Sequence, residues 1–347
     1  MFLKLKNRIE AELAGYIRSI DKLYSFKKTS PVLFRYIDEF ISRKGKRIRP
    51  IFFLVGYLGF SKKTAPGLYR SAISMELLHD FLLVHDDIID KSELRRGKPS
   101  MHAMFNNYLK KYRNIKFNGQ DLAIVVGDIM YAMAMHSFLA IKEDRKRKEE
   151  AFKIFIDAVL RTGSGEFIEL LAGLKNIDKI TKSDIYRIYD LKTGNYTFAA
   201  PLIIGATLAG AKTNYIKKLS EYGIYMGRAF QIKDDIIGLF GEEEKIGKSI
   251  LSDLQEAKKT ILIWHAYRHT DQKGKQIIKK IFSKNKVDRM DLLKMRRLVS
   301  ETGSLLYAKK EMSTCVKMAQ NCLKSIKIFP QYKKLLSEYP QGLINDN

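Results

Sequence analysis

Apolar residues recur through most of the chain at the spacing of an α-helix, about 3.6 residues per turn. Ile51, Leu54, Val55 and Leu58 form one such set, and a second runs through residues 77–84. Glycines and prolines, which interrupt helices, separate these segments. The predicted breaks are Pro50, residues 97–99, residues 163–165, Pro201, residues 238–247 and Pro330. The pattern predicts an all-α fold, a bundle of helices joined by short loops.

The composition of the 347 residues agrees with a helical, globular chain. Hydrophobic residues make up 46% of it, enough to bury a large core, and only 7 residues are prolines. No stretch rich in Pro, Gly or Ser divides the chain, and no segment repeats itself. We therefore expect a single domain over residues 1–347.

Three other segments bear on the class of protein. Residues 122–141 have nearly the length of a membrane span, but Asp128 and His136 interrupt the apolar stretch, and we interpret it as a buried helix. Residues 106–119 are polar and basic, which predicts an exposed insertion. The charged first ten residues do not resemble a signal peptide, so we expect a cytoplasmic protein.

The chain is strongly basic, with 63 Lys and Arg against 38 Asp and Glu and a net charge of +25. Residues 268–347 are rich in basic side chains but lack the interleaved aromatic residues of a single-strand-binding groove. We interpret them as a solvated helical region and expect no binding of nucleic acid, with a polyanion site as the alternative. A peripheral contact of the basic termini with a membrane surface stays open.

Three acids end an apolar segment that begins at residue 72. Asp86 and Asp90 are one helical turn apart and Asp87 lies between them, so the first two carboxylates share a face. Like charges this close repel each other unless a cation joins them, and carboxylate oxygens suit Mg²⁺ that also binds phosphate oxygens. This pattern predicts a magnesium site, and the alternative is a solvated acidic helix end.

A second acidic pair, Asp234 and Asp235, ends another apolar segment that begins at residue 227. Two such pairs on different helices could face one another across a cavity. We expect them to enclose three Mg²⁺ ions bridged by a diphosphate.

Basic residues suited to a diphosphate stand near the acids. Arg95 and Arg96 follow the first motif, while Lys46 and Arg49 precede a helix expected to begin at Pro50. Guanidinium groups bind phosphate oxygens in pairs, and a helix start adds free N–H groups. Further candidates are Lys192, Thr193, Lys248 and Lys258. Each of these alone is more typical of solvated surface charge.

Motifs of several other enzyme classes are missing. Residues 241–249, GEEEKIGKS, place five residues between the glycines where a phosphate-binding loop needs four, and three of the five are Glu. The chain has no HExxH, GxSxG or Rossmann-type glycine motif. Zinc hydrolysis, serine hydrolysis and dinucleotide redox chemistry are therefore unsupported.

Seven motifs in one order resemble the trans-isoprenyl diphosphate synthase (polyprenyl synthetase) family. They are GKRIRP, ELLHDFLLVHDDIIDKSELRRGKP, GD, KTG, FQIKDD, GK and SDLQEAKKT, all within residues 44–260. The resemblance implies the isoprenoid-synthase fold, an all-α homodimer with a deep central cavity in each subunit. It also implies Mg²⁺-dependent condensation of isopentenyl diphosphate with an allylic prenyl diphosphate.

The resemblance further implies a role for each matching residue. Asp86, Asp90 and Asp234 would bind Mg²⁺, and Asp87 and Asp235 would support them. The allylic diphosphate would contact Arg95, Lys192, Thr193, Gln231, Lys248 and Lys258. Isopentenyl diphosphate would contact Lys46, Arg49, His79 and Arg96.

The chain departs from the family pattern at four positions. Gly238 stands where many farnesyl-type members carry a third acid, a difference that many other members share. Ala257 replaces a usual Gly, and Glu166 and Glu169 replace a usual Gln and Asp. These last three differences loosen the implied placement of metal and diphosphate.

Product length depends on the side chain that closes the cavity. Phe81 is five residues before Asp86, about 7.5 Å deeper along a helix, and Leu82 follows it. One aromatic residue followed by an aliphatic one resembles geranylgeranyl-type members, so we expect geranylgeranyl diphosphate. A farnesyl or longer polyprenyl product is the alternative.

Two other functions compete with prenyl transfer. A class I terpene cyclase shares the aspartate-rich motif but has no need of Lys46, Arg49 and Arg96. A non-catalytic partner subunit would be expected to lose the first acidic motif, which is intact here. The residues therefore favour an enzyme that binds both diphosphates.

Overall fold

The structure, a computed structural model, describes residues 1–241 and 250–345, with side chains up to residue 342. The chain divides into two compact units. The first comprises Met1–Phe152 with Ile204–Gly210, and the second comprises Lys153–Ile203 with Ala211–Asn347. The expectation of one domain over residues 1–347 stays a prediction.

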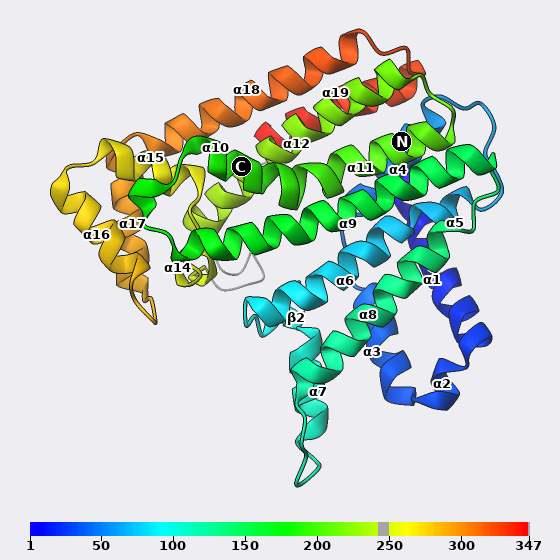
Figure 1. Cartoon of the computed structure of the whole chain (residues 1–347), viewed down its shortest axis with the longest axis horizontal. Coiled ribbons are helices and arrows are strands. Elements are labelled where there is room, and N and C mark those ends of the chain that lie inside the picture. Colours follow the sequence, from blue (N-terminus) through cyan, green and yellow to red (C-terminus); the bar gives the residue numbers. More distant parts are fainter. Residues whose placement is uncertain (242–249, 346–347) are drawn as a thin grey trace. The chain divides into compact units, whose positions relative to one another are not determined.

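The first unit is almost entirely helical (Figure 1). Its helices are α1 (Phe2–Tyr24), α2 (Phe26–Thr29), α3 (Pro31–Ile41), α4 (Ile48–Leu58), α5 (Leu68–Ala72), α6 (Ser74–Ile89), α7 (Met101–Leu109) and α8 (Gly119–Phe138). Within the described residues, the only strands are β1 (Leu94–Arg95) and β2 (Lys98–Pro99), a short antiparallel pair. The all-α prediction is confirmed.

The second unit is also helical. Its elements are the 3-10 helix η1 (Ile177–Lys179), α10 (Lys182–Tyr189), the π-helix η2 (Asp190–Ala199), α12 (Thr213–Phe240), α14 (Ser252–Gln255), α15 (Ile261–His269), α16 (Gln272–Phe282), α17 (Arg289–Glu301), α18 (Ser304–Lys324) and α19 (Pro330–Asn345). The chain passes between the units inside α9 (Arg145–Leu174), inside α11 (Ala200–Leu208) and again after Gly210.

Side chains that accept backbone N–H groups start several of these helices. The Ser30 hydroxyl accepts the Leu33 N–H at 3.3 Å before α3, whose first residue is Pro31. Asn118 and Asp121 form a reciprocal capping box at the start of α8. Residues next to each of these helix starts therefore determine where the helix begins.

Helices α6 and α8 pack against each other in the first unit. The hydrophobic residues of α4 are almost all buried, and α11 approaches this helix closely. A Cβ on Gly205 of α11 would lie 2.1 Å from the Phe53 carbonyl oxygen, so only glycine permits this contact. This packing holds the start of α4, where Arg49 lies, in place.

Helix α8 is long and apolar enough to cross a membrane by length and composition, and 44% of its apolar window is buried. Val126 and Met130 are buried on one face, whereas Ile124 and Val125 are exposed on the other. The expectation of a buried helix therefore holds along one face of α8.

In the second unit, α12 packs against both α18 and η2 (Figure 1). Glycines bring two of these backbones together. A Cβ on Gly227 would lie 2.0 Å from the Gly194 Cα, and one on Gly223 would lie 2.3 Å from the Ala199 Cα. This close packing places the Lys192 to Thr197 segment beside the helix that carries the second acidic motif.

Some predicted helix breaks are wrong. Residues 163–165 lie inside α9 rather than between helices. A Cβ on Gly165 would lie 2.9 Å from the Leu191 Cβ, so this glycine serves close packing of α9 on η2. Pro50 is the third residue of α4, not its first. The predicted loop at 238–247 begins only after Phe240, and residues 242–249 lie outside the described part of the chain.

Candidate active site

The first acidic motif lies at the C-terminal end of α6. Asp86 and Asp87 are in its last turn, and Asp90 is the residue that ends the helix. One carboxylate oxygen of Asp86 lies within 4.8 Å of one of Asp90. The spacing of these two acids therefore brings them together as predicted, at a distance that a single divalent cation spans.

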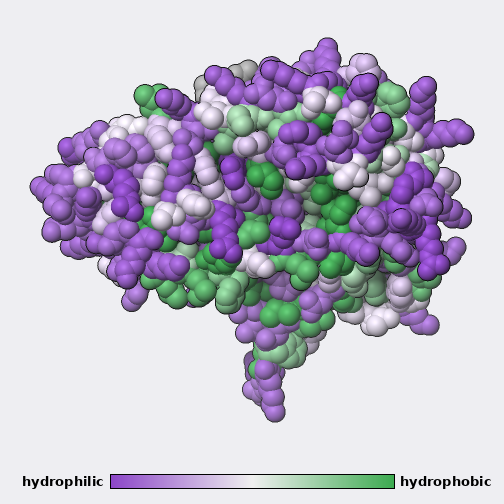
Figure 2. Space-filling model, turned by 45° about the horizontal axis from the view of Figure 1, so that its top comes forward, coloured by the Kyte–Doolittle hydropathy of each residue, from purple (hydrophilic) through white to green (hydrophobic). Residues whose placement is uncertain are grey.

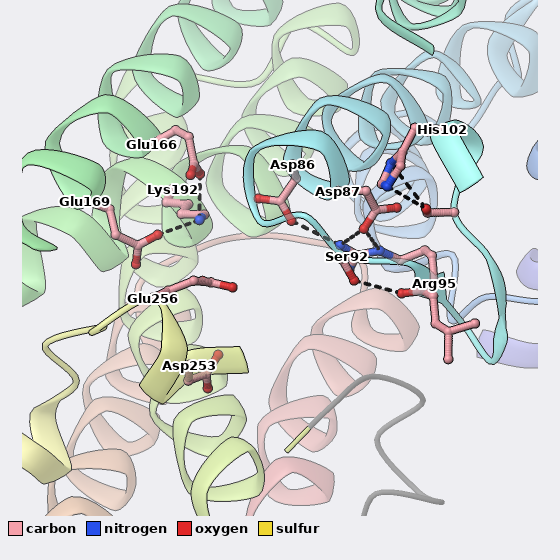
Figure 3. A network of polar contacts seen from close by, with 12 residues as sticks. Asp86, Asp87, Ser92, Arg95, His102, Glu166, Glu169, Lys192, Asp253 and Glu256 are labelled. Atoms are coloured by element: carbon pink, nitrogen blue, oxygen red, sulfur yellow. Dashed lines mark hydrogen bonds and ion pairs between the residues drawn. The ribbon is translucent and has the colours of Figure 1, made fainter. Parts of the chain in front are cut away.

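Arg95 holds the motif from the β1–β2 hairpin. Its Nε donates to Asp87 Oδ1 at 2.8 Å, its Nη2 also donates to that oxygen, and Nη2 donates to Asp86 Oδ2 at 3.2 Å (Figure 3). The hairpin turns at Arg96 and Gly97, both with positive φ. This tight turn directs the Arg95 guanidinium back to the end of α6.

Asp86 and Asp87 differ in exposure. Asp87 is fully buried, and its second carboxylate oxygen has no hydrogen-bond partner among the described residues, whereas Asp86 is partly exposed. Burial raises the pKa of Asp87 to about 6, and Arg95 partly opposes that shift. Asp87 therefore fixes Arg95, while binding of a ligand by Asp86 and Asp90 stays a prediction.

The structure brings three of the predicted isopentenyl diphosphate ligands together within the first unit. Burial lowers the pKa of His79 well below its usual value, and the positive charges of Arg49 and Arg96 lower it further. Arg96 also lies against the loop before α4, where its guanidinium carbon is 3.5 Å from the position of a Gly45 Cβ. Lys46 is exposed in that loop.

Sequence reasoning missed the buried charges beneath this cluster. Arg47 is inaccessible; its Nη1 donates to Glu76 Oε1 at 2.7 Å, and its Nε donates to Glu10 Oε1 at 2.9 Å. Its backbone is left-handed, with φ of 53°. Arg47 is therefore a structural residue that shapes the loop between Lys46 and Arg49.

Asp80 is the second missed residue. It is fully buried, and neither carboxylate oxygen has a hydrogen-bond partner among the described residues. Burial raises its pKa to about 8, and Glu76 adds to the rise. The signal was present in the sequence, because Glu76 and Asp80 are charged residues one turn apart in the mainly apolar first half of the helix.

The second acidic motif lies near the C-terminal end of α12. Asp234 is exposed and Asp235 is buried. The Gln231 side-chain amide donates to Asp235 Oδ1 at 3.0 Å, and the Tyr189 hydroxyl donates to Oδ2. Burial raises the pKa of Asp235 well above its usual value. Tyr189 was not predicted, and its distance in sequence left no local signal.

Two predicted substrate ligands join this network. The Thr193 hydroxyl donates to Gln231 Oε1 at 2.7 Å, so Thr193, Gln231 and Asp235 form one chain of hydrogen bonds. The Tyr189 oxygen in turn accepts the Ile261 N–H at 3.1 Å. The network ties η2, α12 and α15 together at the motif.

The predicted lysine ligands are bound to carboxylates. Lys192 Nζ lies 2.6 Å from Glu166 Oε2 and 2.5 Å from Glu169 Oε2 (Figure 3). Lys258 Nζ lies 2.6 Å from Glu256 Oε2 and 3.6 Å from an Asp253 oxygen. Lys248 lies outside the described residues.

Two departures from the family pattern have structural consequences. A Cβ on Gly238 would lie 2.3 Å from Asp253 Oδ2, so the Asp253 carboxylate occupies the space beside the position of the missing third acid. Ala257 has φ of 52°, a left-handed backbone that favours glycine. The usual glycine thus fits the local backbone better than the alanine of this chain.

With this geometry in view, similarity to known proteins decides the family. The sequence profile described as "Polyprenyl synthetase" matches residues 30–299. The chain belongs to the polyprenyl synthetase family. It is therefore a prenyltransferase of the polyprenyl diphosphate synthase class. The proposed facing of its two acidic motifs stays a prediction, because they belong to different units.

The names of similar proteins agree with this family assignment. A short chain isoprenyl diphosphate synthase of Methanocaldococcus jannaschii is 32% identical over 81% of this chain and 77% of its own length. A geranylgeranyl diphosphate synthase of Saccharolobus solfataricus is 29% identical over 88% and 85%. Other relatives are named for geranylfarnesyl and octaprenyl products.

A solved structure confirms the isoprenoid-synthase fold. It is a geranylgeranyl pyrophosphate synthase from Corynebacterium glutamicum, complexed with isoprenyl diphosphate and magnesium. Its TM-score to this chain is 0.90 at 22% identity, and the match covers 99% of each chain.

Proposed function

We propose that this chain condenses isopentenyl diphosphate with an allylic diphosphate to form geranylgeranyl diphosphate. One observation carries the proposal: the first unit holds an acidic pair with Arg95 and also a cluster of Arg49, His79 and Arg96. An acidic pair suits a metal-bound diphosphate, and a cationic cluster suits a second diphosphate without a metal. A terpene cyclase needs only the first of these sites.

Magnesium fits the residues present. The near oxygens of Asp86 and Asp90 form a hard donor pair, and Asp234 is exposed at the second motif. We propose that these three residues hold three Mg²⁺ ions. When bound, the ions withdraw electron density from the allylic diphosphate and so favour its departure.

The residues of the chain then have distinct tasks. Arg95 donates hydrogen bonds to the allylic diphosphate from one side of the motif, and Lys192 and Lys258 exchange their present carboxylate partners for phosphate oxygens. Thr193 and Gln231 add hydrogen bonds, and Lys248 belongs to the same proposed set. Arg49 and Arg96 hold isopentenyl diphosphate.

The chemistry proceeds by loss of diphosphate. The allylic C–O bond breaks and the diphosphate leaves with the electron pair, which produces an allylic carbocation. The double bond of isopentenyl diphosphate attacks this cation and forms the new C–C bond. A proton then passes to the departed diphosphate, which regenerates an allylic diphosphate five carbons longer. Apolar surroundings keep water from the cation.

The proposed product length depends on Phe81 and Leu82, both half-buried on α6. The Phe81 ring lies 5.1 Å from the Tyr131 ring of α8 and 4.8 Å from His85. Helices α6 and α8, which pack together, thus place two aromatic rings about one and a half turns below Asp86. This pair supports a floor that stops growth at twenty carbons.

Replacing the floor tests the proposal. Phe81→Ala removes a ring and should lengthen the main product by at least one five-carbon unit. Phe81→Tyr keeps the ring and should leave the product unchanged. The measurement is chromatography of products from labelled isopentenyl diphosphate, Mg²⁺ and each of three allylic starters. Equal products from Phe81→Ala and wild type would reject the floor, and no product from any starter would reject the function.

We further propose a cytoplasmic homodimer. Helix α9 carries a row of exposed apolar residues, with Leu160, Phe167 and Leu174 at 64%, 63% and 84% exposure and seven residues apart. Such a row on a long helix is typical of a covered face. Light scattering should give about twice the chain mass of 40.1 kDa, and a monomer mass would contradict the proposal.

A further inference from the structure

The last turn of α7 and the loop that joins it to α8 are a concentrated source of positive charge. Residues 106–118, which we call the basic hairpin, carry four cations and no acid. They are Lys110, Lys111, Arg113 and Lys116, all exposed. No Asp or Glu occurs anywhere between Leu94 and Gln120. The charge of this loop is therefore not balanced locally, and it favours an anionic partner.

Large apolar side chains lie in the same segment. Tyr112, Ile115 and Phe117 are 47%, 43% and 48% exposed. Exposed apolar residues that are scattered singly are ordinary, but three within six residues among cations are not. Aromatic residues interleaved with basic ones are typical of segments that lie in the headgroup region of a bilayer.

An apolar cavity lies between the hairpin and helices α3 and α8. This cavity of about 460 Å³ is lined by hairpin residues, including Tyr108 and Tyr112, and by α8 residues such as Val126. Lys111 Nζ lies 4.2 Å from the Tyr108 ring centre and 5.1 Å from that of Tyr112. Positive charge therefore stands directly at the edge of an apolar surface, which suits a molecule with an anionic head and a hydrocarbon tail.

The hairpin projects from the first unit, with hydrophilic side chains at its end and hydrophobic ones nearer its base (Figure 2). Its base is held firmly, since the Gly119 N–H donates to Asn106 Oδ1 at 2.8 Å. A projecting, anchored loop can reach a flat surface that the rest of the unit does not touch.

The hairpin also lies at the end of the unit that carries the first acidic motif. Gly127 of α8 contacts His85 of α6, and Tyr131 contacts Phe81, so the two helices run in opposite directions. The start of α8 at Gly119 is eight residues, or about 12 Å, before Gly127. It therefore lies past the C-terminal end of α6. A surface bound by the hairpin would thus face the motif end of α6.

We propose that the basic hairpin binds the surface of an anionic lipid bilayer. Lys110, Lys111 and Arg113 attract the anionic headgroups, and Tyr112, Ile115 and Phe117 enter the headgroup region. Because the charges are exposed, the attraction weakens as salt rises. The contact does not depend on the proposed function, since binding needs no substrate.

Vesicle sedimentation with the full chain tests the proposal. Wild-type protein should bind vesicles of phosphatidylcholine with phosphatidylglycerol at ~0.15 M salt and bind phosphatidylcholine alone at least about tenfold more weakly. The variant Lys110→Gln/Lys111→Gln/Arg113→Gln should lose at least about tenfold in apparent affinity for the anionic vesicles.

A matched control separates the hairpin from the general charge of the chain. Lys309→Gln/Lys310→Gln/Lys317→Gln removes the same charge from exposed positions of α18 and should bind like wild type. The apolar variant Tyr112→Ser/Ile115→Ser/Phe117→Ser should also lose about tenfold. Its control, Met290→Ser/Leu293→Ser/Leu306→Ser, changes residues that are at least as exposed and should bind normally.

Several results would overturn the proposal. One is equal loss in the hairpin and α18 charge variants, which would mean attraction to total charge. Another is equal binding to anionic vesicles and to vesicles of phosphatidylcholine alone. A third is hairpin-dependent binding of random DNA without vesicle binding, which would make the hairpin a nucleic-acid surface. Circular dichroism and prenyl transfer with soluble substrates should be unchanged in all four variants. These measurements distinguish loss of vesicle binding from failed folding and from lost activity.

Discussion

The two acidic motifs each bury one carboxyl group but stabilise it with different partners. Asp87 in the first unit is held by the Arg95 guanidinium, whereas Asp235 in the second is held by the neutral donors of Tyr189 and Gln231. Burial raises the pKa of both, to about 6 for Asp87 and well above the usual value for Asp235. An ion pair stabilises the ionised carboxylate directly. Asp87 is therefore more readily ionised than Asp235 before a ligand binds.

The motifs share a second feature. Each buried acid has a more exposed neighbour, Asp86 beside Asp87 and Asp234 beside Asp235. The inner residue connects the motif to the rest of its unit, and the outer residue is the one that we propose binds a ligand. Variants of outer residues should therefore change activity, and variants at inner contacts should change stability.

The largest expected effect follows from an outer acid. Asp86→Asn removes a charge that we propose binds metal, and should lower kcat/KM by about a hundredfold or more, with little change in the free energy of unfolding. Asp157→Asn, at an exposed position of α9, should leave both unchanged. Steady-state kinetics with Mg²⁺ makes the measurement. Full activity in Asp86→Asn would remove the first motif from the mechanism.

Breaking the ion pair of the first motif should cost stability. Arg95→Met leaves Asp87 buried without its partner and should lower the free energy of unfolding by about 3 kcal/mol at pH 8. Arg145→Met, at an exposed ion pair with Glu149, should cost about 0.5 kcal/mol or less.

The same variant has an expected pH dependence. The folded-state pKa of Asp87 is raised to about 6, so its stabilising contribution is complete below about pH 4 and is lost as pH rises through about 6. Losing Arg95 raises that pKa further, so the cost of Arg95→Met should grow from pH 5 to pH 8. Urea unfolding in EDTA measures it, and a cost independent of pH would contradict the assigned pairing.

The second motif predicts a smaller loss. Tyr189→Phe removes a hydroxyl donor from Asp235 and an acceptor from the Ile261 N–H, and should lower the free energy of unfolding by about 2 kcal/mol. Tyr222→Phe removes a buried hydrogen bond to a backbone carbonyl and should cost about 1 kcal/mol. If both variants lower the free energy of unfolding equally, the hydrogen bond to Asp235 adds no stability beyond that of an ordinary buried hydrogen bond.

The smallest expected effect is a gain in stability. Ala257→Gly relieves a left-handed backbone at φ 52° and should raise the free energy of unfolding by roughly 1 kcal/mol. Ala14→Gly, at an exposed site inside α1, should lower it by roughly the same amount. Chemical denaturation of the pair tests the sign. A loss in Ala257→Gly would show that another contact fixes this backbone.

Sequence reasoning succeeded where the signal was local or carried by a motif. The i, i+4 spacing of Asp86 and Asp90 predicted their shared face, and the family resemblance named Arg49, His79 and Arg96, which lie near one another; that they bind one substrate stays a prediction. It failed at residues 163–165, where glycines predicted a break and instead allow α9 to pack on η2. The role of a glycine depends on what approaches it, which the one-dimensional pattern does not contain.

By itself, the sequence determined the all-α class, the acids at the ends of two helices and the family to which the chain belongs. Helical period and capping act within a few residues, so a linear pattern is sufficient for them. Only the tertiary structure decided that Arg47 would be buried on Glu76, that Asp80 would have no hydrogen-bond partner among the described residues, and that Tyr189 would hold Asp235. Partner choice and burial arise when segments far apart in sequence pack together, and that packing sets which charge each group keeps.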